Sequence, residues 1–163
     1  MAIIKPNNNT ISAITALPAA IPTGKVLQVV TATDGTNRST TSETFGLNSS
    51  TLTLDITPSA TSSKILITCS VMLYISASAA RLTIFRDSTN LAAAISANSE
   101  DSFITTDGDG KYFSTSGLHI LDSPNTTSST NYQVRFRNNQ SSTTTTLPNT
   151  SAIGVLTATE IGA

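Results

Sequence analysis

The sequence offers few side chains at the spacings that chemistry requires. The stretch Asp-Gly-Asp-Gly at 107–110, preceded by Glu100 and Asp101, supplies the carboxylate oxygens that Ca²⁺ prefers. The EF-hand pattern fails, however, because it needs Asp or Asn where Lys111 stands and Gly where Tyr112 stands. We therefore expect a turn at 107–110 and no metal site.

A catalytic triad can be written on paper from His119, Asp122 and one of many serines. No Gly-x-Ser-x-Gly elbow occurs, and serine is so abundant that its proximity to a histidine means little. His119 is interpreted as a strand residue on a polar face, or as an interface residue near a threefold axis. The sequence also lacks a P-loop, a Gly-x-Gly-x-x-Gly motif and a paired-carboxylate signature. It predicts a protein that is not an enzyme and holds no cofactor.

Cys69 is the only cysteine, which excludes an intrachain disulfide and a cysteine-based zinc site. It falls within an apolar row, so we expect a small buried hydrophobe rather than a reactive thiol.

Four arginines would form a basic surface if their strands were neighbours: Arg81, Arg86, Arg135 and Arg137. A formal net charge of −1 and an aromatic content of 5% argue against a nucleic-acid partner. We interpret these arginines as parts of solvated faces or as partners in pairs between subunits.

The element that must position any site is a long alternating run from Lys64 to Ser76. Every second residue is apolar, which places six side chains on one face of a β-strand: Ile65, Ile67, Cys69, Val71, Leu73 and Ile75. The opposite face carries Leu66, Met72 and Tyr74, which are more apolar than a freely solvated face needs. We expect a central strand of an antiparallel sandwich, with Leu66, Met72 and Tyr74 facing another layer or another subunit.

The rest of the chain repeats this pattern over shorter lengths. Ser and Thr make up roughly a third of the 163 residues and charged residues 12%, a composition that suits β structure. Alternation between turn signals predicts further strands over 25–33, 52–56, 81–86, 111–121, 132–137, 143–147 and 153–161. Residues 38–44 are predicted to be a polar loop or a weak edge strand. The fold class expected is an all-β, jelly-roll-like antiparallel β-sandwich over residues 25–163.

Residues 1–24 differ from this pattern. Apolar residues recur every three or four positions, at Ile11, Ile14, Leu17 and Ile21, but Pro18 and Pro22 prevent a lasting helix. We expect an extended attachment arm that lies on a neighbouring subunit or another protein; a frayed terminus is the alternative. No stretch reaches the roughly 18 apolar residues of a membrane helix, and the N-terminus is a poor signal peptide. We therefore expect synthesis in the cytoplasm and no membrane partner.

Several segments, taken in order, resemble a β-sandwich module of tailed-bacteriophage virion proteins, especially those of marine and cyanobacterial phages. They are Gly-Lys-Val-Leu-Gln-Val-Val at 24–30, Ile-Thr-Pro at 56–58 with Ser-Ser-Lys-Ile-Leu at 62–66, Leu-Asp-Ser-Pro at 121–124 with Tyr-Gln-Val at 132–134, and Ala-Thr-Glu-Ile at 158–161. The resemblance spans residues 24 to 163 and brings no catalytic residues with it.

This resemblance implies a homotrimeric structural protein of the virion, made in the host bacterium's cytoplasm, with other virion proteins such as the major capsid protein as partners. Related modules lie at the ends of tail fibres, on head fibres and on capsids as decorating or cement proteins. No extended repeat precedes the module here, which favours a small capsid-decorating or head-fibre protein. The alternative is a fibre tip that recognises a host glycan or surface protein, with Tyr112 and Phe113 beside the glycine-rich loop as the stacking residues.

Overall fold

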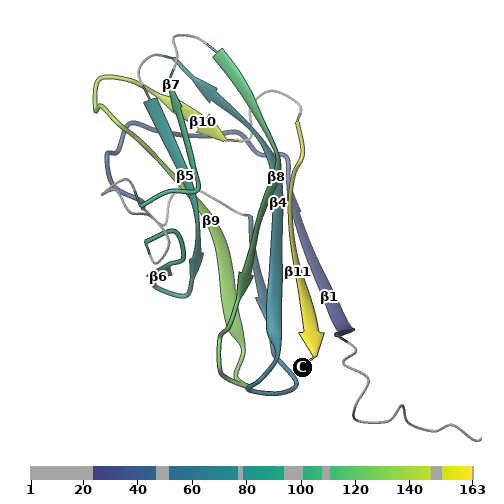
Figure 1. The fold of residues 1–163 in the computed structure, drawn as a ribbon. Helices are drawn as coiled ribbons and strands as arrows, with labels where there is room; N and C mark the ends of the chain where they lie inside the picture. The colour runs from purple at the N-terminus through teal and green to yellow at the C-terminus, as the bar shows by residue number, and fades with distance from the viewer. Residues whose placement is uncertain are drawn as a thin grey trace, which may run out of the picture.

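The structure of the protein is a computed structural model that describes residues 24–46, 52–76, 79–93, 101–107, 111–147 and 152–162, with the backbone alone described for 104–107 and 111–117. Two antiparallel sheets lie face to face, and no helix occurs among the described residues (Figure 1). The prediction of an all-β sandwich is confirmed. The predicted attachment arm falls on residues outside the described ranges, apart from Gly24.

The first sheet, called sheet A here, is built around the predicted central strand. It contains β1 (Lys25–Asp34), β2 (Arg38–Thr40), β4 (Lys64–Ile75), β8 (Lys111–Asp122), β10 (Thr145–Leu147) and β11 (Gly154–Gly162). Strand β4 pairs with β8 along one side and with β11 and then β10 along the other, and β1 pairs with β11 at the edge.

The second sheet, sheet B, is smaller. It contains β3 (Thr53–Ile56), β5 (Ala79–Arg86), β6 (Thr89–Asn90), β7 (Ile104–Asp107) and β9 (Thr130–Asn138). Strand β9 lies between β3 and β5, and β5 pairs on its other side with β6 and β7. The strands predicted outside 38–44 agree with the observed ones to within two residues at each end. Within 38–44 only β2, residues 38–40, is a strand, and β6 and β7 were not anticipated.

The long strands alternate between the sheets along the chain. From β3 to β4, β5, β8, β9 and β11, each connection crosses from one sheet to the other. This is the connectivity of a jelly-roll-like sandwich, in which neighbours within a sheet are distant in sequence. Side chains far apart in the chain are therefore brought together.

The core lies between the two sheets. All six members of the predicted row on β4 are at most 3% exposed. Leu82 and Ile84 of β5, and Val134 and Phe136 of β9, are fully buried and belong to the same core cluster. Because strand side chains alternate, burying these rows leaves each sheet with one outer face.

Candidate functional site

The outer face of sheet B is covered by the chain itself. The residues of β5 that face outward, Arg81, Thr83 and Phe85, are 6%, 0% and 9% exposed. The segment after β2 crosses this face: the Asn138 amide donates to the carbonyl of Ser42 at 2.8 Å, and the Phe45 ring lies 6.1 Å from that of Phe85. Sheet B therefore has little free surface along β5.

Two arginines of this face stack on aromatic rings, one on β5 and one on the segment that covers it. Strands β5 and β9 are neighbours, and Arg81 stands opposite Arg137. The guanidinium of Arg135 stacks 4.0 Å above the ring of Phe85, and that of Arg137 lies 5.2 Å from the ring of Phe45. Burial lowers the pKa of Arg135 and of Arg137. The interpretation of these groups as solvated is wrong for Arg81, which is buried, and the stacking was not anticipated.

The outer face of sheet A is open. Across its four long strands, Val29 of β1, Thr159 of β11, Leu66 of β4 and Leu121 of β8 stand side by side in register, and the next row is Thr31, Thr157, Thr68 and His119. Val26, Val29 and Leu121 are more than half exposed. Among the described residues of this face, Lys64 is the one with a fixed charge, whereas a soluble surface is usually about 25–35% charged. This open, nearly uncharged face is the candidate functional site.

The predicted interface residues of β4 lie on this face. Leu66, Met72 and Tyr74 alternate with the buried row and are half-buried, with Thr68 and Ser70 exposed between them. No second layer of the described chain covers this face, and its contact with another subunit stays a prediction. The other predicted interface residues, Ile11, Ile14, Leu17 and Ile21, lie outside the described residues.

A hollow of about 320 Å³ lies in the outer face of sheet A. The register between β4 and β8 shifts at Cys69 and Ser70, so that Gly117 is left without a partner on β4. Leu66 and Val155 supply apolar side chains from the outer face, and Thr68, Ser70 and His119 supply polar atoms; the core residues Cys69 and Leu118 also contribute to the lining. A β-bulge of this kind bends a strand locally, and here it accompanies a depression in a flat face.

The proposed recognition residues Tyr112 and Phe113 lie in the first residues of β8 rather than in a loop. Their backbones pair with Tyr74 and Leu73 of β4. The neighbouring acidic stretch at 108–110 lies outside the described residues. Recognition of a host molecule through Tyr112 and Phe113 thus stays a prediction.

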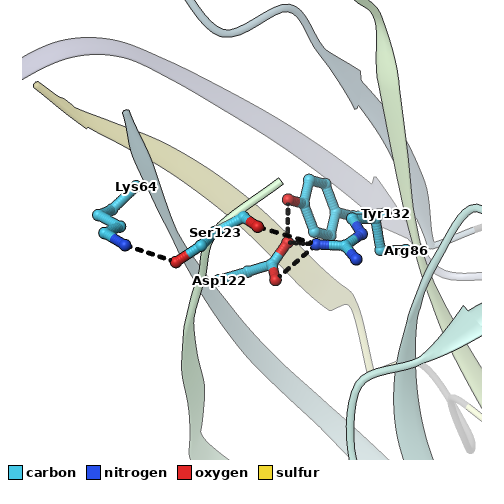
Figure 2. A network of polar contacts seen from close by, with 5 residues as sticks. All are labelled: Lys64, Arg86, Asp122, Ser123 and Tyr132. Atoms are coloured by element: carbon cyan, nitrogen blue, oxygen red, sulfur yellow. Dashed lines mark hydrogen bonds and ion pairs between the residues drawn. The ribbon is translucent and has the colours of Figure 1, made fainter. Parts of the chain in front are cut away.

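A polar cluster connects the two sheets at the end where the chain enters β1 (Figure 2). Nη1 of Arg86 donates to both carboxylate oxygens of Asp122 at 2.9 and 3.0 Å, and the hydroxyl of Tyr132 donates to Oδ2 at 2.6 Å. Burial and the neighbouring Asp122 raise the pKa of Tyr132. The sequence analysis did not predict this cluster. Arg86, expected on a solvated face or in a pair between subunits, pairs with Asp122 of its own chain instead.

A second buried carboxylate lies at the same end. Glu160 of β11 is fully buried, and its Oε1 accepts from the amide and hydroxyl of Ser59 at 2.7 and 2.6 Å. Its Oε2 accepts from Nε2 of Gln28 on β1 at 2.6 Å. Burial alone would raise the pKa of Glu160, but these hydrogen bonds to the charged form lower it to about 2. Glu160 thereby fastens the edge strand β1 to the loop between β3 and β4.

The residues suggested on paper for a triad are not assembled. His119 is exposed on the outer face of sheet A, whereas Asp122 faces inward and is held by Arg86 and Tyr132. Within the described ranges, no group of three or more His, Cys, Asp or Glu side chains could hold a metal ion. No helix in the described part of the chain is long and apolar enough to cross a membrane.

No protein-family model matches the sequence, and no curated protein sequence matches it significantly.

Proposed function

We propose that the protein is a non-enzymatic structural component of a tailed-bacteriophage particle, which works by association. Copies of the chain meet through the outer face of sheet A as a homotrimer, and the N-terminal segment attaches the trimer to other virion proteins such as the major capsid protein. The protein decorates the head, as a cement or head-fibre protein, after its synthesis in the host cytoplasm.

The observation that carries this proposal is the contrast between the two outer faces. Sheet B uses its own chain to cover β5, with Phe45 on Phe85 and arginines stacked above both rings. Sheet A leaves Val26, Val29 and Leu121 exposed on a face where Lys64 is the one fixed charge among the described residues. Depletion of charge at the centre, with apolar residues in its place, is the composition of protein interfaces.

The size of the face supports the same proposal. Strand β11 has 9 residues and β4 has 12, which correspond to lengths of about 30 and 40 Å. Four strands at a spacing of about 4.8 Å give a width of about 19 Å, and hence an area of about 600–750 Å². Standard interfaces bury about 600–1,000 Å² per partner, so the area of the face falls in the lower part of that range.

The first test is the oligomeric state of the purified full-length chain, measured by native mass spectrometry over a range of concentrations. We expect a trimer. Leu66→Glu places a charge on the face and should give monomers that stay folded, with the wild-type circular-dichroism spectrum and a melting temperature that no longer depends on protein concentration. Thr127→Glu, at an exposed loop position, is the matched control and should leave the trimer intact. A wild-type chain that is monomeric at all concentrations would contradict the proposal.

The second test is the copy number in purified particles, measured by quantitative mass spectrometry against the major capsid protein. Hundreds of copies per particle are expected of a shell-wide decorating protein. A handful, in multiples of three, would indicate a fibre or tail tip and would favour receptor binding. Absence of the chain from the particles would overturn the proposed function.

A further inference from the structure

We propose that the hollow beside the β4–β8 bulge is the central socket of the interface between copies, and that Ile153 of a second copy occupies it. This inference rests on the self-association proposed above and assigns its specific contact. The argument uses the shape of the hollow, the exposure of Ile153 and the charge of the face.

The hollow is suited to an aliphatic side chain. Leu66, Leu118 and Val155 line it, while Thr68, Ser70 and His119 supply the polar part of its lining. An apolar cavity of about 150 Å³ is enough to bind benzene, and this hollow measures about 320 Å³. The four carbons of an isoleucine side chain therefore fit with room for neighbouring atoms of the same loop.

Ile153 is the most exposed large apolar side chain among the described residues, at 67%. It immediately precedes β11, where Gly154 faces the core: a Cβ atom at Gly154 would lie 2.7 Å from Cδ1 of Leu52 and 3.2 Å from Cγ2 of Val71. Val155 of β11 faces outward, and the exposed Ile153 lies two residues before it, where its Cγ1 is 3.9 Å from the position of a Cβ at Gly35. Ile153 thus projects from the face that contains the hollow without filling it.

The low charge and the area of the face fit a second copy as the occupant. The described part of the face carries Lys64 and no carboxylate, so two copies can meet there without repulsion between several like charges. Ile153 and the hollow are different parts of one chain, so their contact is heterologous, and a heterologous contact closes into a ring when its rotation permits. Contacts that dominate binding energy tend to be side chains held in a central pocket of an interface.

The test is disulfide formation between two chains that each carry one new cysteine. Ile153→Cys and Ser70→Cys are made in separate chains with different tags, both also carrying Cys69→Ser, and the chains are co-expressed and oxidised with diamide. A disulfide requires Cα atoms about 4.4–6.8 Å apart, so the two tagged chains should become covalently joined. Thr31→Cys replaces Ser70→Cys as the control, because Thr31 lies on the same face two strands from β4 and should give no joined product.

A second measurement needs no change to Cys69. Ser70→Phe fills the hollow from its exposed side and should weaken association at least 100-fold while the chain keeps the wild-type circular-dichroism spectrum, whereas Thr31→Phe should weaken it only several-fold. A wild-type trimer that shows no joined product and tolerates Ser70→Phe would overturn this inference and leave the proposed self-association standing. Equal losses from Ser70→Phe and Thr31→Phe would also overturn it. A monomeric wild-type chain that is missing from particles would instead reject the proposed function.

Discussion

The hydroxyl of Tyr132 on β9 donates a 2.6 Å hydrogen bond to the carboxylate of Asp122 on β8, and so connects sheet B to sheet A. The same carboxylate accepts both contacts from Arg86, and the Asp122 side chain is only 10% exposed. A buried charge is stable when it is paired and hydrogen-bonded. This cluster therefore fixes the relative position of the sheets at one end of the sandwich.

Tyr132→Phe should lower the free energy of unfolding by about 1.5–3 kcal/mol, because it removes a hydrogen bond to a charged group and keeps the buried ring. Asp122→Ala should cost about 3–5 kcal/mol, since it leaves Arg86 without its partner. Urea denaturation measures both. Thr126→Val, which removes an exposed hydrogen bond from the Ser128 amide, is the control and should stay within about 0.5 kcal/mol of wild type. Equal effects of all three substitutions would contradict the role of the cluster.

Glu160 should make stability depend on acid. Its pKa is lowered from 4.5 to about 2, so the folded state favours the carboxylate, and its contribution is full above about pH 4.5 and is lost as the pH falls towards 2. Glu160→Gln should therefore be destabilising at pH 7, and its difference from wild type should shrink between pH 4.5 and 2. Denaturation curves at several pH values test this. Glu43→Gln controls for net charge, and a difference that is constant across this pH range would refute the prediction.

Cys69 should be nearly inert towards thiol reagents in the folded protein. Burial raises the pKa of its thiol from 9.0 to about 12, which reduces the reactive thiolate roughly 1000-fold at neutral pH. Ellman's reagent should react slowly with the native chain and rapidly in urea. The Thr127→Cys, Cys69→Ser variant, with its thiol in an exposed loop away from that face, should react rapidly in both conditions. Fast native labelling of wild type would show that Cys69 is accessible.

Gly154 and Gly35 should respond differently to alanine. A Cβ at Gly154 would meet Leu52 at 2.7 Å, whereas at Gly35 the nearest heavy atom lies 3.9 Å away. Gly154→Ala should cost about 1–3 kcal/mol through overpacking of the core. Gly35→Ala is the matched control and should change stability by less than about 0.5 kcal/mol. Thermal and urea unfolding measure the stability of both variants, and equal stabilities would contradict overpacking at Gly154.

Much of the sandwich could be predicted because alternation is a local property of a strand. The apolar row from Ile65 to Ile75 predicted which face of β4 is buried, including the burial of Cys69. The same alternation put Leu66, Met72 and Tyr74 on the opposite face, where they are half-buried. The same reasoning placed His119 on a polar face. It also suggested which side of β4 would be left for a partner.

The neighbours of each strand were decided by tertiary structure alone. Asp122 meets Arg86 from 36 residues away, and Glu160 meets Gln28 from 132 residues away, because successive strands alternate between sheets. Two further features also depend on which strands are neighbours: the contact of Phe45 with the outer face of sheet B, and the hollow beside the β4–β8 bulge. Periodicity fixes the face on which a side chain lies, since it follows from the backbone geometry of a single strand. It carries no information about the partner strand, so the sequence by itself determined the faces and only the fold determined the contacts.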